Sequence, residues 1–122
     1  MRIFKTKYFS KWAASEGLAD ESLKQAVSEL NQGLHDGALG SNVYKKRVGI
    51  AGKGKRGGAR CIVAFKTAAD TFFLYGYSKS DRETIDPKEE LAFRKFAKDL
   101  FSFDQNKINQ LLKSKELIEV TS

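Results

Sequence analysis

The feature that most constrains the fold of this 122-residue chain is a series of three strand-like runs with no helical pattern between them. The runs span Val43 to Ala51, Ala59 to Thr67 and Thr71 to Lys79. The connection Ala68-Ala69-Asp70 is short enough for a hairpin, so the second and third runs should be antiparallel neighbours. The middle of the chain is therefore predicted to form consecutive strands of one sheet.

Two helices are expected before these strands. A short strand from Arg2 to Tyr8 leads into a helix around Lys11 to Ala14, which Gly17 would end. Asp20 is a plausible N-cap for the second helix. Its core-facing stripe is predicted from apolar residues at helical spacing, which are Leu23, Ala26, Val27, Leu30 and Leu34.

Two further helices are expected after the strands. Asp86 with Pro87 and Glu89 has the residue types that open a helix, and Asp104 would cap the last one. We expect an apolar stripe at Phe93, Phe96, Ala97, Leu100 and Phe101. The order of elements predicts one α+β domain over residues 1–122, with a mainly antiparallel four-stranded sheet. Helices should cover only one face of that sheet, with the N-terminal helices packed there and the C-terminal helices completing the domain.

Charge is distributed very unevenly along the sequence. No acidic residue occurs between Asp36 and Asp70, and this interval contains eight basic residues: Lys45, Lys46, Arg47, Lys53, Lys55, Arg56, Arg60 and Lys66. The remaining 14 basic and 15 acidic residues nearly cancel, so this one interval accounts for the net charge of +7. Such a patch attracts polyanions, although a solvated strand-loop-strand unit is the alternative interpretation.

Composition also limits the chemistry. A single cysteine, Cys61, excludes an intramolecular disulfide and suits a reducing cytoplasm, where we expect it to be a buried apolar residue. One His and one Cys are too few for a typical metal site, so neither a metal nor a cofactor is expected. The sequence has neither a signal peptide pattern nor a membrane-spanning apolar run, which predicts a cytoplasmic protein without a membrane partner.

A glycine-rich segment from Gly49 to Arg56 nearly matches a P-loop. Arg56 stands where that motif needs a Ser or Thr for magnesium, and another strand follows where a helix is required. We therefore expect a loop whose glycines let the backbone approach a partner while Lys53, Lys55 and Arg56 contact phosphate. An ordinary flexible hairpin loop is the alternative.

Lys46-Arg47-Val48, the run from Gly52 to Arg60 and the run from Phe72 to Ile85 together resemble the RelE/HigB superfamily of bacterial toxins, most closely its HigB-like branch. The resemblance implies a small RelE-like fold and a toxin that enters the ribosomal A site and cuts mRNA. It also implies neutralisation by a cognate antitoxin, expected to be a helix-turn-helix protein through which alone the toxin would meet operator DNA.

The same resemblance assigns candidate site residues. The family's loop lysines match Lys53 and Lys55, its strand arginine matches Arg60, and its basic group after the last strand matches Lys79 or Arg82. This sequence departs from the family at 81–87, where several members have a Tyr or His that transfers a proton.

Metal-free RNA cleavage uses the neighbouring 2′-hydroxyl as nucleophile, so the protein must hold the phosphate, stabilise developing negative charge and move two protons. A Lys whose pKa is lowered by cationic neighbours, or a Tyr, would have to serve as the base. The predicted catalytic residues are Lys53, Lys55, Arg60 and Lys79. The predicted RNA-binding residues are Lys45, Lys46, Arg47, Arg56, Tyr75, Tyr77 and Arg82. By strand alternation, Tyr75 and Tyr77 should share a face with Phe73 and Lys79.

Two other classes of function fit the sequence. A ParE-like toxin would use the same scaffold to poison DNA gyrase without catalysis, and a non-catalytic module would only bind RNA. The absence of a Tyr or His at 81–87 keeps the second alternative open.

Overall fold

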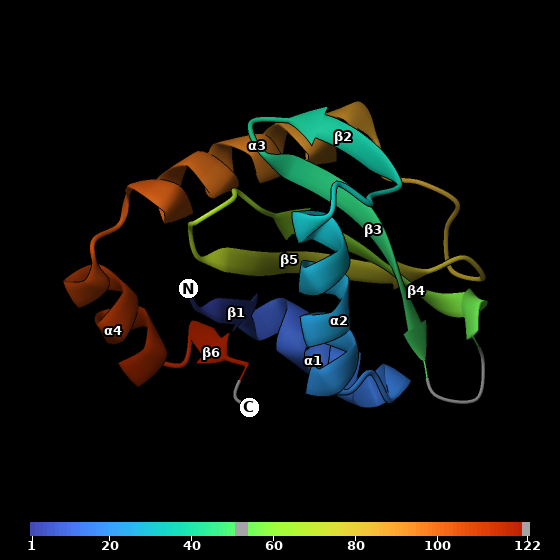
Figure 1. The fold of residues 1–122 in the computed structure, drawn as a ribbon, viewed down its shortest axis with the longest axis horizontal. Helices are drawn as coiled ribbons and strands as arrows, with labels where there is room; N and C mark the ends of the chain where they lie inside the picture. The colour runs from blue at the N-terminus through green and yellow to red at the C-terminus, as the bar shows by residue number, and fades with distance from the viewer. Residues whose placement is uncertain (51–53, 121–122) are drawn as a thin grey trace.

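The computed structural model describes the backbone of residues 1–50 and 54–120, and their side chains except those of 54–57. Figure 1 shows the arrangement of the helices and strands in this part of the chain. In chain order they are β1 (Ile3–Thr6), α1 (Lys7–Glu16), α2 (Asp20–Asn31), β2 (Gly37–Gly40), β3 (Val43–Ile50), β4 (Gly54–Ala64), β5 (Thr71–Ser78), α3 (Pro87–Ser102), α4 (Gln105–Lys113) and β6 (Leu117–Glu119).

The strands form one six-stranded sheet in the order β2-β3-β4-β5-β1-β6. The predicted antiparallel pairing of β4 with β5 is confirmed, and β3 also pairs antiparallel with β4. The α+β class is confirmed as well, but the expectation of four mainly antiparallel strands was wrong in detail. β1 runs parallel to β5, which makes the sheet mixed, and two short strands that the sequence did not reveal, β2 and β6, form its edges.

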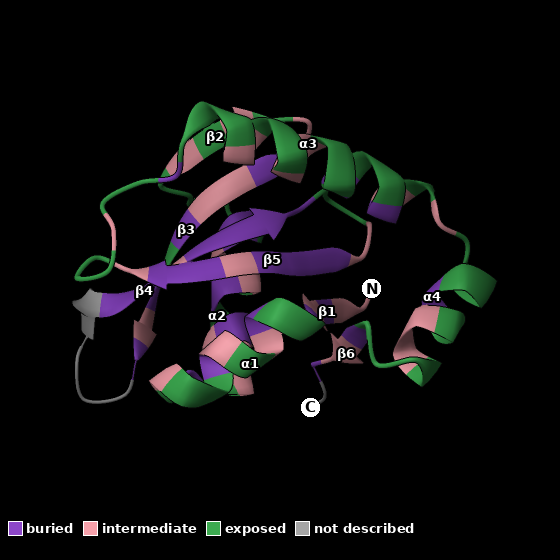
Figure 2. Cartoon of the chain, turned by 180° about the vertical axis from the view of Figure 1, so that it is seen from behind, coloured by how far each residue is buried: buried purple, intermediate pink, exposed green. Residues whose placement is uncertain are grey.

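Helices cover both faces of the sheet, not one as predicted. On one face, α1 and α2 pack over Cys61 and Val63 of β4. On the other, α3 packs over Ile62 and Ala64 of the same strand. Figure 2 shows the central strands almost entirely buried between these layers. Both sets of alternating positions on β4 are apolar, so both faces of the strand need a covering layer.

A bulge in β5 changes which side chains share a face. Ile62 of β4 pairs with Tyr75, whereas the next residue, Val63, pairs with Phe73, so Leu74 is an extra residue in the ladder. Phe73 therefore joins the core under α1 and α2, while Tyr75 and Tyr77 face α3. The predicted common face of Phe73 and the two tyrosines was wrong for this reason.

Most of the predicted helix ends are confirmed. Gly17 adopts a left-handed conformation (φ 72°) after α1, and Asp104 caps α4. Asp86 and Glu89 form a reciprocal capping box at the start of α3, which fixes Glu89 beside the loop that follows β5. Asp20 differs from its prediction, since it is the first helical residue of α2 and Ala19 occupies the N-cap.

Gly76 lets α1 pack closely on β5. A Cβ atom at this position would lie 2.2 Å from the ring of Trp12 in α1, a distance that no real contact allows. The missing side chain therefore lets Trp12 rest on the strand backbone between Tyr75 and Tyr77, which fixes the part of β5 that carries both tyrosines.

Candidate phosphate-binding site

Arg47, Arg60 and Tyr77 form a row across the three central strands. Arg47 of β3 lies directly opposite Arg60 of β4, and Arg60 lies directly opposite Tyr77 of β5. All three line a cavity of about 320 Å³, which we call the Arg60 cavity and which also contacts Asp36, Lys45, Lys46 and Glu83. The antiparallel meander thus brings together two arginines and a phenol that are far apart in the sequence.

Arg60 is the least compensated charge of this row. Its Nη1 atom is buried and has no hydrogen-bond partner among the described residues. A buried donor without a partner costs about 1–3 kcal/mol, and more when the group is charged. Its direct neighbour across the β3–β4 ladder is another arginine, which adds repulsion. A bound anion would relieve both costs.

Tyr77 is 3% exposed, and burial raises the pKa of its phenol above the ordinary value. The positive charges of Arg60 and Arg82 oppose this shift but do not cancel it. Tyr77 is therefore protonated at neutral pH, which makes it a hydrogen-bond donor toward an oxyanion and a possible source of a proton.

Asp36 holds Arg47 in place. One Asp36 carboxylate oxygen accepts from the Arg47 backbone N–H at 2.8 Å, and the other accepts from Arg47 Nε at 3.2 Å. Lys45, two residues earlier on β3, donates from Nζ to Thr84 Oγ1 at 3.2 Å. These contacts orient two cations at the edge of the Arg60 cavity.

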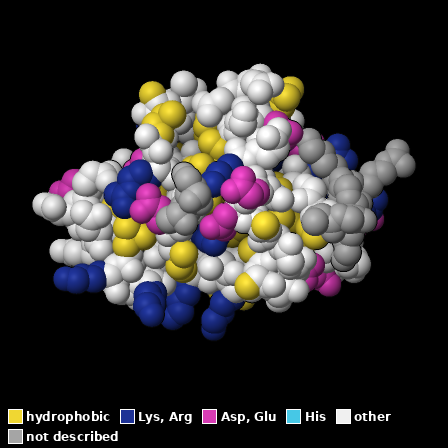
Figure 3. Space-filling view, turned by 60° about the horizontal axis from the view of Figure 1, so that its bottom comes forward, with side chains coloured by type: hydrophobic (Ala, Val, Ile, Leu, Met, Phe, Trp, Pro, Cys, Tyr) yellow, Lys and Arg dark blue, Asp and Glu magenta, His cyan; other side chains and the backbone are white. Residues whose placement is uncertain are grey.

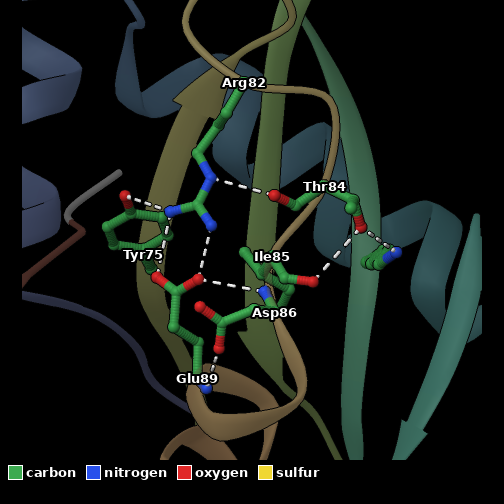
Figure 4. A network of polar contacts seen from close by, with 7 residues as sticks. Tyr75, Arg82, Thr84, Ile85, Asp86 and Glu89 are labelled. Atoms are coloured by element: carbon green, nitrogen blue, oxygen red, sulfur yellow. Dashed lines mark hydrogen bonds and ion pairs between the residues drawn. The ribbon is translucent and has the colours of Figure 1, made fainter.

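Arg82 is engaged in a network of its own, drawn in Figure 4. Both Nη atoms donate to the two carboxylate oxygens of Glu89, and Nε donates to the carbonyl of Thr84 at 2.9 Å. Nη1 also donates to the Tyr75 hydroxyl at 3.4 Å. Hydrogen bonds to Glu89 and Tyr75 raise the pKa of Arg82, and Arg82 in turn lowers that of Glu89. The network fastens the loop after β5 to the first turn of α3.

The other predicted site residues take different positions. The Lys46 side chain is 5% exposed and pairs with Glu29 of α2 at 2.7 Å, so it is directed toward α2 although Lys46 also borders the Arg60 cavity. Lys79 is exposed in the turn after β5, at the end of the sheet where β4 begins. Tyr75 packs against Tyr77 and Phe93. Three predicted residues lie outside what the structure describes, in whole or in their side chains: Lys53, Lys55 and Arg56.

Two carboxylates that line the cavity were not predicted from the sequence. Asp36 precedes the acid-free interval, and Glu83 lies in the loop after β5. The family resemblance implies a Tyr or His at 81–87 as the proton-transfer group, although a carboxylate also performs this task. Glu83 lies within that stretch and lines the same cavity as Arg60 and Tyr77.

Cys61 is fully buried, as expected, and burial raises the pKa of its thiol. The described residues contain no cluster of three His, Cys, Asp or Glu side chains able to hold a metal ion. Nor does any helix in this part of the chain have the length and apolarity needed to cross a bilayer. What the described residues at the Arg60 cavity can do chemically is bind an anion, donate a proton from Tyr77 and accept one at Glu83.

Comparison with known protein families gives a match over nearly the whole chain. Residues 1–120 match the family described as the RelE toxin of the RelE / RelB toxin-antitoxin system. A comparison with individual curated proteins gives no significant match.

Proposed function

Because this chain belongs to the RelE family and is therefore a toxin of a toxin–antitoxin system, we propose that it is an mRNA endoribonuclease that acts on the ribosome. The observation that carries this proposal is the buried Nη1 atom of Arg60 beside Tyr77, which has no hydrogen-bond partner among the described residues. A phosphate group bound here would accept a hydrogen bond from that atom. The backbone of an mRNA in the ribosomal A site supplies such a phosphate.

In the proposed site, Arg60 and Arg47 bind the non-bridging oxygens of the scissile phosphate. Their charge stabilises the additional negative charge that develops as the phosphorus becomes five-coordinate. Arg47 is held in place by Asp36. Arg60 is fixed within β4 and requires little reorganisation when the phosphate binds.

Proton transfer is assigned to Glu83 and Tyr77. The Glu83 carboxylate takes the proton of the ribose 2′-hydroxyl while that oxygen attacks the adjacent phosphorus. The bond from phosphorus to the 5′-oxygen breaks, and the Tyr77 phenol gives its proton to this leaving oxygen. The products are a 2′,3′-cyclic phosphate and a free 5′-hydroxyl, so atoms and charge balance. The raised pKa of Tyr77 keeps its phenol protonated at neutral pH, as a proton donor must be.

The predicted loop and turn lysines complete the proposal. Lys53, Lys55 and Lys79 supply further positive charge to the same phosphate, and Arg56 contacts neighbouring ones. Within the family, we favour the HigB-like branch because of the sequence of glycines and lysines at 52–60. The protein would act in the cytoplasm without a metal or cofactor, and a helix-turn-helix antitoxin would neutralise it and link it to operator DNA.

The test uses ribosomes programmed with a defined mRNA, and the ends of the cleaved mRNA are mapped. We expect A-site cuts by the wild type and a loss of at least about 100-fold in rate for Arg60→Ala, as for removal of one oxyanion donor. Arg60→Lys should retain part of the activity. Lys95→Ala, an exposed change on α3, is the matched control.

Full cleavage by folded Arg60→Ala would sink the assignment of this site. Intact mRNA together with inhibited gyrase supercoiling would instead establish the ParE-like function. Intact mRNA and active gyrase would leave a module that only binds RNA.

A further inference from the structure

Glu83 has no contact of its own that would fix its side chain at the Arg60 cavity. It lies in the loop between β5 and α3, and its side chain is exposed. Its carboxylate makes no hydrogen bond or ion pair within the described residues. A long polar side chain without contacts keeps its rotamer freedom, which opposes a fixed place at the cavity. The position of Glu83 is therefore set by its two neighbours in the chain, Arg82 and Thr84.

The Arg82 side chain closes a ring around Glu83. Its Nε donates to the carbonyl oxygen of Thr84 at 2.9 Å, so this bond spans the one residue between them (Figure 4). The backbone N–H of Arg82 donates to the carbonyl oxygen of Ser78, the last residue of β5, at 3.2 Å. The backbone before Glu83 is thus tied to the sheet, and the backbone after Glu83 is tied to Arg82.

The second half of the loop is held by other elements. Thr84 Oγ1 accepts a hydrogen bond from Lys45 Nζ of β3 at 3.2 Å. Ile85 is 4% exposed and belongs to the core that packs under α3. Asp86 then caps α3. Glu83 is therefore an exposed residue whose neighbours on both sides are held in place.

The Arg82 guanidinium has little capacity left for a phosphate. Within the described part of the chain it makes four hydrogen bonds, to Thr84, Tyr75 and Glu89, which leaves one N–H on Nη2 unused. The Glu89 carboxylate also neutralises its charge. Arg60 differs, since its buried Nη1 has no partner among the described residues. These contacts favour a structural task for Arg82 and a phosphate-binding task for Arg60.

Arg82 also borders the other group to which proton transfer is assigned. Its Cζ lies 5.8 Å from the centroid of the Tyr77 ring, within the range of a cation–π contact. One side chain therefore touches the phenol of the site and encloses the residue that carries its carboxylate. A displacement of about 1 Å at a reacting group can lower a rate by about 100-fold, so the hold of Arg82 on the loop has a large effect on cleavage.

We propose that Arg82 is a positioning residue that holds the Glu83 carboxylate at the Arg60 cavity, and that Glu89 fixes Arg82 for this task. The inference rests on the proposed role of Glu83 as the base. It gives Arg82 a role different from the RNA contact expected from the sequence, because Arg82 acts through Glu83 and does not touch the phosphate.

Single-turnover cleavage of mRNA on programmed ribosomes separates the two roles of Arg82. Arg82→Gln should lower the maximal rate by up to about 100-fold, and the ribosome concentration that gives half this rate should not change. Arg82→Lys should be equally slow, because an ammonium group cannot make the bidentate pair with Glu89. Lys95→Gln removes an exposed charge from α3 and should cleave like the wild type. Substantial activity in Arg82→Lys would overturn the proposal.

A double-variant cycle tests whether Arg82 acts through Glu83. In the Glu83→Gln background, the further change Arg82→Gln should lower the rate by no more than about twofold, since the carboxylate that Arg82 holds is already absent. Losses that multiply in the double variant would show that Arg82 acts through another group, and the proposal would fail.

RNA binding supplies a test that does not depend on cleavage. Affinity alone does not isolate Arg82, because the protein has other basic side chains, several of which Figure 3 shows in a row along one margin of the molecule. The salt dependence of the affinity counts phosphate contacts, with a slope that changes by about 0.7 for each contact to a single strand. With a single-stranded RNA oligonucleotide, Arg60→Gln should reduce this slope and Arg82→Gln should not. A reduced slope in Arg82→Gln would make Arg82 a phosphate contact.

The mobility of Glu83 distinguishes failure of this inference from failure of the proposed function. Its backbone order parameter from NMR relaxation should be about 0.85 in the wild type and below about 0.6 in Arg82→Gln, the values of rigid and flexible backbone. Glu89→Gln should show the same fall, so the test stands even if Arg82→Gln does not fold. Equal order parameters in the wild type and both variants would overturn the proposal. If the wild type cleaves no mRNA, the nuclease function fails, and the order parameters still decide whether Arg82 holds Glu83.

Discussion

Arg60 of β4 lies directly opposite Arg47 of β3, and its inner Nη1 atom has no partner among the described residues. Two like charges at directly opposed positions of a sheet destabilise the pairing. Both arginines lie in the middle of the sheet. Arg60 therefore lowers the free energy of unfolding relative to an apolar residue at the same position.

Arg60→Met should therefore stabilise the folded protein by about 1–3 kcal/mol, the cost of one buried unsatisfied donor. Urea denaturation at neutral pH measures this change. Inorganic phosphate should raise the midpoint of the wild type more than chloride does at equal ionic strength, and the variant should lose this difference. A less stable Arg60→Met protein would show that the arginine is compensated in the folded state.

Tyr77→Phe should lower the cleavage rate by about 10²–10⁴-fold with little change in RNA affinity. The folded protein raises the pKa of Tyr77, so the protonated phenol favours folding. This contribution is fully present below the unfolded pKa of about 10 and is lost as pH rises through the folded value. Wild type and variant should thus differ in how their stability falls at alkaline pH. Identical alkaline unfolding curves would mean that the phenol titrates alike in both states.

Glu83→Gln should remove the acidic limb of the pH–rate profile, since a carboxylate acts as a base only when ionised. We expect a loss of about 10²–10⁴-fold in the cleavage rate with unchanged binding of RNA. Asp99→Asn, an exposed change on α3, serves as the control. A profile that keeps its acidic limb in Glu83→Gln would assign the base to another residue.

Glu89→Gln should make the folded protein less stable at neutral pH but should not change its stability in strong acid. Arg82 lowers the folded pKa of Glu89, so the ionised carboxylate favours folding. This contribution is present above the unfolded pKa of about 4.3 and is lost as pH falls through the folded value. Wild type should therefore be the more stable protein at neutral pH, and the difference should vanish in strong acid. Glu90→Gln, one residue along α3, is the control, and a difference that persists in strong acid would contradict the ion pair as its source.

Gly76→Ala should destabilise the fold by about 1–3 kcal/mol, because the added methyl group would meet the Trp12 ring. Trp12 is the only tryptophan in the sequence, so its fluorescence reports the displacement directly. Gly37→Ala is a matched control on the same sheet, where the new Cβ would lie 3.6 Å from Lys45, an ordinary contact. Replacing Trp12 by Leu in the Gly76→Ala background should recover part of the loss, and no recovery would place the strain elsewhere.

Much of the fold was predictable from local sequence. The strands of the meander and the caps at Gly17, Asp86 and Asp104 depend on the chemistry of a few neighbouring residues. β2 and β6 were not predictable in this way, because strands of four and three residues carry almost no periodic signal. Each exists because a partner strand offers its edge, which is a property of the tertiary structure.

The site was predictable in its charges but not in its detail. The acid-free interval indicated an anion site, and alternation placed Arg60 on the face opposite Cys61. Two features of the site depend on side-chain contacts between different elements, namely the pairing of Lys46 with Glu29 and the pairing of Arg82 with Glu89. The bulge at Leu74 also could not be foreseen, because an extra residue in the ladder leaves no recognisable pattern in the sequence of the strand.

The parallel pairing of β1 with β5 joins segments that are far apart in the sequence, so we expect it to form later in folding than the meander of β3, β4 and β5. The row of Arg47, Arg60 and Tyr77 belongs to a local meander, whereas β1 and β6 bring together segments from both ends of the chain. Contacts between distant segments form late and are the first to open in partial unfolding. Mild heat or low denaturant should therefore detach β1 and β6 from β5 while the row of Arg47, Arg60 and Tyr77 persists, so that a partly unfolded protein would keep its affinity for phosphate.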